Sequence, residues 1–510
     1  MAAVGDELGD ARLDELVEES VHRRAREAGD RCQLPHLVRP IGLGQRTEDT
    51  HRAVDDGATS SVLAHAINIP RAVRRARSVR WADTTSTGAL PRSSIEFVNP
   101  RDEHLRAGYM PFTPEGQDAA SEVLAHLRQT TPVFFSPELG SWVVTRYDDA
   151  NTVLRDATTF SSSGALGAPP IPEVADVLDA GRVTDGATLI GWDEPEHGRM
   201  RTMLAAAFTP ARSRLLQPVI RRRTERILDG LSTNRSVDVL NEIALPIALD
   251  TVFDLIGVPE AQRAECFRWS TEWGRLHGAA LEGLEPSAQV ELARSAVNLH
   301  QTMSGLLDAR REAPQDDLLS AVLAEQATSA EPLSDVELLS LFPGLVFAGH
   351  ETAANLVANT LWLMLVHGSD VEEIGAAVDE AARLESPFAA TARTTTCPVR
   401  LGQVDLPAGE RVSVHLGSAN RDESLYDKPA SFDPSRANLN KQLAFGRGPH
   451  FCIGSSLAHV EVTTVLQVMF DRWPNMTLAA LPRRAGHFLM RGFASLEVLP
   501  HGDDTDELPD

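Results

Sequence analysis

Apolar residues recur with a helical period along most of the chain after residue 96. Residues 285–385 follow this pattern almost throughout and include one long apolar segment from Leu338 to Val366. Residues 193–231 predict two more helices, separated near Thr209 and Pro210, because proline favours the first turn of a new helix. The pattern predicts a mainly α-helical protein.

Strand signals are few. Residues 141–156 predict a short strand followed by a helix that begins near Asp148. Residues 399–417 alternate between apolar and polar positions, which predicts a hairpin with Pro407, Ala408 and Gly409 at its turn. A final helix is expected after residue 454. We therefore expect a mainly α fold with small β-sheets, in one large domain over residues 96–500.

The first 95 residues have a different composition. An arginine-rich run at 71–81 is followed by a segment of small and polar residues at 82–94, which is typical of a linker. The run could form a basic amphipathic helix that binds a surface or a partner. Alternatively, residues 1–95 are a mobile extension or follow from a misplaced start codon. An acidic tail is expected at 501–510.

Charge and cysteine content exclude several classes of protein. The net charge of −24 disfavours binding to nucleic acid or anionic membranes. The four cysteines form no CxxC pair, which argues against a zinc ribbon, a dithiol redox site and covalent haem attachment. The acidic N-terminus is unlike a signal peptide, and no stretch reaches eighteen apolar residues. These features predict a cytoplasmic protein.

One cysteine lies in an unusual loop, "AFGRGPHFCIG", at residues 444–454. Glycines allow close backbone approach, and Cys452 directly precedes a predicted helix, whose N–H groups and dipole favour a thiolate. A thiolate on haem iron pushes electron density toward bound oxygen and promotes O–O cleavage. A purely structural cysteine would not explain Phe445 and His450 at their fixed offsets.

The stretch "FGRGPHFCIG" resembles the haem-thiolate signature of the cytochrome P-450 family, Phe-Gly-x-Gly-x-His-x-Cys-x-Gly, and fills every specified position. The resemblance implies haem b (iron protoporphyrin IX) as cofactor, held between a long central helix and the helix after the cysteine. It implies that Cys452 is the axial ligand of the iron, within a haem-binding loop that includes Phe445, Gly446, His450 and Gly454.

A second motif, "AGHETA", interrupts the long apolar segment. Gly349 and Thr352 are poor helix formers, and a threonine hydroxyl can bond back to the preceding turn, so we expect a local widening or kink. A Glu-Thr pair on a helix is otherwise a solvated face. The family resemblance implies that Ala348 and Gly349 give oxygen room over the iron, and that Glu351 and Thr352 deliver protons to it.

Two further motifs match the family in position. Glu380 and Arg383 lie on one helix face and could be a surface pair. The resemblance implies instead a buried structural network with Arg436. In "HGRMR", His197 and Arg201 are one helical turn apart. The resemblance implies that these two, with Arg393 and His450, hold the haem propionates.

The resemblance covers residues 96–500 and is strongest to the soluble bacterial branch. It implies a monooxygenase that uses dioxygen, with electrons from NAD(P)H through separate ferredoxin and ferredoxin reductase chains, because no flavin or ferredoxin domain follows. A monomer is expected. Arg447, Arg212 and Arg214 could form a basic patch for the ferredoxin. The alternatives are a hydrogen-peroxide-driven peroxygenase and a non-catalytic haem-thiolate protein for gas sensing or docking.

The substrate is less defined by the sequence. We expect residues 163–191, Phe347 and Ala348, and residues 387–392 to line the pocket, with Phe388, Ala389 and Thr391 in the last segment. These are mostly small or apolar, which favours an apolar molecule of small to moderate size. The serines at 161–163 could bind the carboxylate of an aromatic acid or simply shape a loop. Terpenes, polyketides, fatty acids and aromatics all stay open.

Overall fold

The computed structural model describes residues 109–110, 114–165, 170–183, 188–368, 371–485 and 489–501 of the 510-residue chain. The predicted N-terminal extension (1–95) lies outside these residues, as does the predicted acidic tail except His501.

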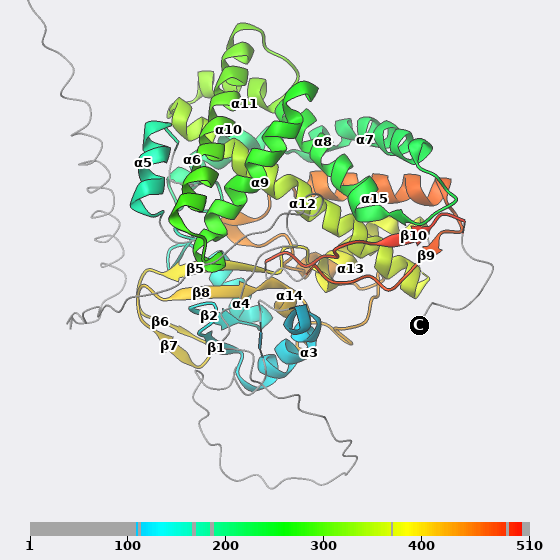
Figure 1. The fold of residues 1–510 in the computed structure, drawn as a ribbon. Helices are drawn as coiled ribbons and strands as arrows, with labels where there is room; N and C mark the ends of the chain where they lie inside the picture. Colours follow the sequence, from blue (N-terminus) through cyan, green and yellow to red (C-terminus); the bar gives the residue numbers. More distant parts are fainter. Residues whose placement is uncertain are drawn as a thin grey trace, which may run out of the picture.

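Helices make up most of the described chain, and the largest sheet lies at one end of the molecule (Figure 1). This confirms the predicted fold class. The larger helices are α6 (Glu196–Ala205), α7 (Pro210–Gly230), α8 (Leu245–Ile256), α9 (Glu260–Glu282), α10 (Pro286–Glu312), α11 (Leu318–Thr328), α12 (Asp335–His367), α13 (Ile374–Leu384) and α15 (Ser455–Arg472). The sheet end carries α3 (Pro114–Thr130), α4 (Tyr147–Arg155) and α14 (Leu416–Ala419), and α5 (Pro172–Ala180) lies beside α10.

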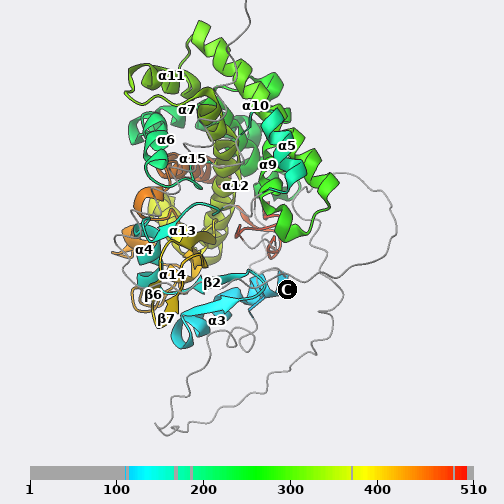
Figure 2. The same cartoon turned by 90° about the vertical axis from the view of Figure 1, so that its left-hand side faces the viewer.

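Helix α12 is the central element of the fold. Figure 2 shows it between α6 and α9, and it also packs against α8, α10, α13 and α15. Ser334 and Glu337 cap its N-terminus reciprocally, and Gly368 ends it in a left-handed conformation. Because α12 is apolar on nearly every side, it is stable only when surrounded by other helices. Its α-helical course is unbroken, so the expected local widening at Gly349 is not seen.

The predicted break near Thr209 is confirmed. The Thr209 side chain accepts a hydrogen bond from the Arg212 backbone N–H, and Pro210 occupies the first turn of α7. Helix α15 then packs along α7 and crosses α12 and α13. By length and composition, Gly448–Arg472 is the one described stretch that could span a membrane. Core helices pass the same test, and α15 has three helical neighbours.

The main sheet has five strands in the order β1 (Val133–Ser136), β2 (Ser141–Val144), β8 (Arg411–His415), β5 (Ala390–Thr395) and β3 (Phe160–Ser161). All neighbours are antiparallel except β2 and β8, which pair in parallel with Trp142 opposite Val412. A second sheet joins β4 (Val237–Asp238), β10 (Glu497–Leu499) and β9 (Thr477–Leu478).

The predicted hairpin is wrong in its turn. Strands β6 (Val399–Leu401) and β7 (Val404–Leu406) form a hairpin that turns at Gly402, where φ is +56°. The Pro407–Gly409 segment instead leads from β7 into β8 of the main sheet. Its course is fixed by Thr395, whose hydroxyl donates to the Pro407 carbonyl and whose carbonyl accepts from the Gly409 N–H.

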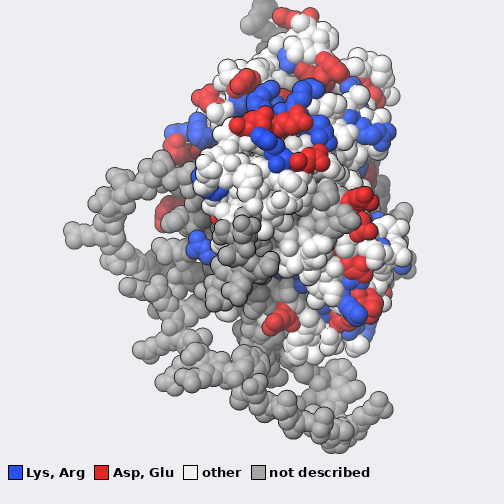
Figure 3. Space-filling model, turned by 90° about the vertical axis from the view of Figure 1, so that its right-hand side faces the viewer, with Lys and Arg blue, Asp and Glu red and all other residues white. Residues whose placement is uncertain are grey.

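Charged side chains of both signs are interleaved in the upper part of the face drawn in Figure 3. Ion pairs account for some of this arrangement. Arg223 and Arg263 each bridge Asp250 and Asp254, which ties α7, α8 and α9 together.

Candidate active site

The cysteine loop (residues 444–454) packs tightly against the C-terminal end of α4. Gly446 and Gly448 both have φ of +70°, which residues with a side chain rarely adopt. A Cβ on Gly448 would lie 2.4 Å from the Leu154 carbonyl oxygen, so this position requires glycine. The Cys452 N–H donates to the Phe445 carbonyl at 2.8 Å, which closes the loop just before α15.

The Cys452 thiol is reached by solvent, although protein atoms surround it closely. This burial raises the pKa of the Cys452 thiol, whereas the backbone N–H groups of Gly454 and Ser455 and the charge of Arg201 lower it. Donors and positive charge beside a sulfur are the surroundings that stabilise a metal-bound thiolate. Cys452 is thus placed to bind a metal at the start of α15.

Two residues of α6 contact this loop. The His197 ring is buried and lies 4.0 Å from the His450 ring, centroid to centroid. His197 Nδ1 is 3.0 Å from Glu194 Oε1, and its Nε2 is buried without a hydrogen-bond partner in the described chain. One turn later, Arg201 Nη2 donates to the Phe451 carbonyl at 2.6 Å. His197 and Arg201 therefore lie on the same face of α6, as their spacing predicted, and both contact the cysteine loop.

Arg393 and His450 join His197 and Arg201 in a cluster that we call cationic because of its two guanidinium groups. Burial, with help from the positive charges of Arg393, His197 and Arg201, lowers the pKa of His450 to about 3. Burial also lowers the pKa of Arg393 to about 10, partly offset by Asp193. That carboxylate already accepts bonds from the backbone N–H and side chain of neighbouring serines. The cluster is therefore suited to an anionic ligand.

These residues fit haem. A buried imidazole nitrogen without a partner costs free energy unless a ligand satisfies it. The donors converge from α6, β5 and the cysteine loop, and haem brings two carboxylates together with an iron that accepts a thiolate. His197, Arg201, Arg393 and His450 would hold the carboxylates, and Cys452 would hold the iron.

Helix α12 presents its motif toward an accessible space. Ala348 is exposed although the helix is otherwise mostly buried, and Glu351 and Thr352 are half-exposed. The Thr352 hydroxyl donates to the Ala348 carbonyl at 2.7 Å, as the sequence suggested. Burial raises the pKa of Glu351 to about 7. Glu351 can therefore exchange a proton near neutral pH.

Gly349 has a packing role that the sequence did not indicate. A Cβ at this position would lie 2.9 Å from Val252 Cγ2 of α8. The absence of a side chain therefore lets α8 and α12 approach closely. Its predicted contribution to an oxygen site stays a prediction.

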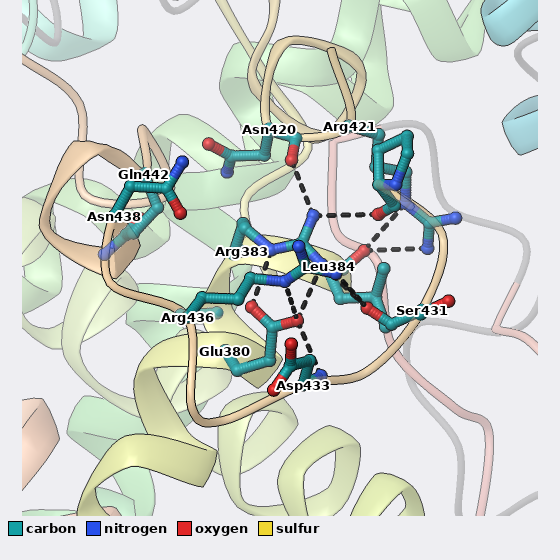
Figure 4. A network of polar contacts seen from close by, with 12 residues as sticks. Glu380, Arg383, Leu384, Asn420, Arg421, Ser431, Asp433, Arg436, Asn438 and Gln442 are labelled. Atoms are coloured by element: carbon teal, nitrogen blue, oxygen red, sulfur yellow. Dashed lines mark hydrogen bonds and ion pairs between the residues drawn. The ribbon is translucent and has the colours of Figure 1, made fainter. Parts of the chain in front are cut away.

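Glu380, Arg383 and Arg436 form the expected buried network (Figure 4). Arg383 binds both carboxylate oxygens of Glu380, at 2.6 and 2.7 Å, and both side chains are fully buried. Arg383 also donates to the carbonyls of Asn420 and Ser431. Loss of one partner from such a buried pair typically costs about 3–5 kcal/mol. The network holds the segment before the cysteine loop against α13.

The residues expected to line the pocket have different packing neighbours. Phe347 packs against Trp273 of α9, whereas Phe388 packs on the core around the main sheet. The Ala389 N–H is bonded to the Leu489 carbonyl, and Thr391 Oγ1 accepts from Arg393 at 3.3 Å. Of the predicted stretch 163–191, residues 166–169 and 184–187 lie outside the described chain.

Ser161 and Ser162 already make hydrogen bonds through their hydroxyl groups. Ser161 Oγ donates to Asp193 at 2.5 Å, and Ser162 Oγ is 2.9 Å from His450 Nε2. Their bonds brace the cationic cluster, which weakens the suggestion that they bind a substrate carboxylate. Sequence reasoning missed this role, and it missed Glu194. The only available signal was that Glu194 lies three residues before His197, within reach at helical spacing.

A long central helix and a cysteine in a glycine-rich loop just before α15, with a cationic cluster beside that loop, define a site of the haem-thiolate class. Residues 369–474 match the family model for cytochrome P-450. The chain is 33% identical over 375 residues to cytochrome P-450 107B1 of Saccharopolyspora erythraea, covering 71% of this chain and 90% of that protein.

Two other proteins are similar over comparable lengths. The 6-deoxyerythronolide B hydroxylase of Saccharopolyspora erythraea is 32% identical, covering 73% of this chain and 94% of its own length. A crystal structure of a cytochrome P-450 in complex with hexadec-9Z-enoic acid ligated to acyl carrier protein matches with a TM-score of 0.67 and 28% identity, over 76% of this chain and 98% of that one. This protein belongs to the cytochrome P-450 family and is a monooxygenase of the bacterial type.

Proposed function

We propose that the enzyme binds haem b through Cys452 and inserts one oxygen atom from dioxygen into an apolar organic substrate of small to moderate size. The reaction would be a hydroxylation, an epoxidation or an O-dealkylation. The observation that carries this proposal is the partnerless Nε2 of buried His197, which lies in a cationic cluster beside the Cys452 loop. We assign the haem-binding unit to residues 96–500 and a cytoplasmic location to the protein.

Haem on a cysteine thiolate supplies an iron that binds dioxygen and promotes O–O cleavage. The chain's own residues do the rest. His197, Arg201, Arg393 and His450 orient the haem carboxylates through charge-assisted hydrogen bonds. The N–H groups of Gly454 and Ser455 lower the basicity of the Cys452 sulfur. Phe445 and Gly446 shape the loop that carries the cysteine.

Proton supply falls to α12. Burial raises the pKa of the Glu351 carboxyl to about 7, so this group can take up and release a proton near neutral pH. The Thr352 hydroxyl, bonded to the Ala348 carbonyl, lies beside the exposed Ala348. Glu351 would pass protons inward, and Thr352 would position them next to the substrate space.

The substrate proposal rests on apolar lining. Phe347 and Trp273 lie near the exposed Ala348, and Phe388 and Ala389 come from the segment before β5. Apolar pockets with few polar groups favour apolar ligands. The names of similar proteins point to a macrolactone hydroxylase and to a fatty acyl complex, and both ligands are largely apolar. An aromatic acid is less favoured because two of its three suggested serine ligands, Ser161 and Ser162, already make hydrogen bonds through their hydroxyl groups.

Electrons would come from NAD(P)H through a separate ferredoxin and its reductase, and the enzyme would act as a monomer. The supporting feature is an open pocket beside the cysteine loop whose lining includes Arg155, Lys441 and Arg447 with a single acidic residue, Asp148. A locally positive surface suits an acidic electron donor. The suggested contribution of Arg212 is weakened, because it pairs with Asp316 at 2.6 Å.

A peroxygenase is the second candidate, and a non-catalytic haem protein is the third. The intact Glu351 and Thr352 pair favours a dioxygen-using enzyme over both. Turnover of an apolar substrate library with NADPH, ferredoxin and reductase, compared with hydrogen peroxide alone, separates the three. Substrates for that library are selected by the spin-state shift that they cause. Product formation with peroxide only would refute the proposed electron source.

A further inference from the structure

Helices α9 and α12 meet where one of them has no side chain. A Cβ on Gly274 of α9 would lie 2.4 Å from Phe347 Cε2 and 2.7 Å from Phe347 Cδ2. Both distances are far inside van der Waals contact, which begins near 3.5 Å for carbon atoms. The Phe347 ring therefore occupies the volume that any larger residue at position 274 would need.

The same ring is confined on a second side. Trp273 is 4% exposed, and its ring centroid is 6.0 Å from that of Phe347 in an edge-to-face arrangement. Trp273 is itself packed on His277, with ring centroids 4.1 Å apart. Phe347 also lies at the edge of a buried cluster from α5, α9 and α10. The ring cannot move toward these groups without displacing a packed core.

The Phe347 ring also has an accessible side. Phe347 is half-exposed and directly precedes Ala348, the exposed residue beside Thr352. A ring pushed away from α9 would move into the space next to Ala348. The size of residue 274 is thereby linked to the room available beside the proposed haem site.

We infer that Gly274 is a specificity-determining residue, which acts by setting the position of the Phe347 ring and hence the size of ligand that fits beside Ala348. This inference rests on the proposed function, because it requires that substrate binds in this space. Position 274 is distant in sequence from every motif of the haem site, and no ligand needs to touch it.

The test uses the full-length holoenzyme and two azole probes of different size, imidazole and 4-phenylimidazole, which bind haem iron through nitrogen and shift its Soret band. Gly274→Ala should weaken binding of 4-phenylimidazole by about tenfold. The added methyl group would push the Phe347 ring into the space that the phenyl group needs, and overpacking by one methyl group has a cost of this size. Binding of imidazole should change by less than about twofold, since it needs little room. Gly305→Ala on α10 is the matched control, because a Cβ there meets nothing within 4 Å.

A compensating variant separates this role from a general packing defect. Phe347→Leu shortens the ring side chain, so the double variant Gly274→Ala/Phe347→Leu should return the ratio of the two dissociation constants to within about threefold of the parent value. An unchanged ratio in Gly274→Ala, an equal loss for both azoles, or failure of the double variant to recover would each overturn the inference. If the parent enzyme shows no Soret shift with imidazole, the proposed haem function fails instead.

Discussion

Arg201 Nη2 lies 2.6 Å from the carbonyl oxygen of Phe451, the residue directly before Cys452. This bond joins α6 to the cysteine loop, and it places a guanidinium group beside the thiol that would bind iron. Arginine carries five N–H donors, so the same side chain would have donors left for a haem carboxylate. Arg201 therefore helps to fix the position of the loop, and we expect it also to contribute to haem retention.

Arg201→Ala should release haem faster. Hydrogen bonds to charged groups contribute about 1.5–3 kcal/mol, so we expect at least about tenfold faster haem transfer to apomyoglobin. Arg212→Ala on α7 serves as the control, because its ion pair with Asp316 lies at the surface. Equal transfer rates in the two variants would contradict the assigned role of Arg201.

Thr352→Ala should uncouple the enzyme. The variant should still bind substrate and accept electrons, but product formed per NADPH should fall by about tenfold or more, with a matching rise in hydrogen peroxide. Thr360→Ala is a matched control on the same helix, since the Thr360 hydroxyl makes the same kind of backbone bond but is fully buried. An unchanged product yield in Thr352→Ala would remove Thr352 from proton delivery.

The Glu351 carboxyl predicts a pH dependence. Its pKa is raised to about 7 by burial, so the protonated form dominates below pH 7 and is lost as the pH rises through 7. If this proton is the one delivered, product formed per NADPH should fall with a midpoint near pH 7. Glu351→Gln cannot titrate, so its yield should be lower and independent of pH over this range. A parent profile that is flat between pH 6 and 8 would rule out Glu351 as the donor.

The pocket beside the cysteine loop predicts where the electron donor binds. Arg447→Glu and Lys441→Glu should each slow ferredoxin-driven reduction about threefold or more at low salt, and less at high salt, because exposed charges act mainly on association. Arg294→Glu on α10 is the control. Arg294 is also exposed but does not line this pocket, so the variant should have no such effect.

Arg447 also donates to the Asn440 carbonyl at 2.6 Å, so it could simply brace the loop. Haem content and reduction by dithionite distinguish the two roles. Docking predicts that both stay normal in Arg447→Glu. Loss of haem together with electron transfer would instead assign Arg447 a structural role, and an unchanged rate would discard the docking site.

Local patterns in the sequence predicted most of the helices and the cysteine loop. Thr209 and Pro210 signalled a helix boundary through capping and proline geometry, which depend on neighbouring residues only. The hairpin turn was wrong because Thr395, distant in the sequence, determines the course of the Pro407–Gly409 segment. Strand order likewise depends on long-range pairing, as in the parallel contact of β2 with β8.

The site residues that lie in short local motifs could likewise be predicted from the sequence, whereas those that depend on long-range contacts could not. Motif spacing brought out Cys452, Thr352 and the Glu380–Arg383 pair, because each lies in a short contiguous pattern. Gly274 lies in no such pattern, and its importance appears only where α9 crosses α12. The second role of Gly349, against Val252, was hidden for the same reason.

The most direct test of this account is the absorption spectrum of the reduced carbon-monoxide complex of Cys452→Ser, compared with the parent enzyme and with Cys266→Ser. Cys266 is a free thiol buried in a hydrophobic core cluster, so its replacement serves as the control. The parent and Cys266→Ser should show the red-shifted Soret band that a thiolate donor produces, and Cys452→Ser should lose it. The same red-shifted band in Cys452→Ser would contradict the assignment of Cys452 as the iron ligand.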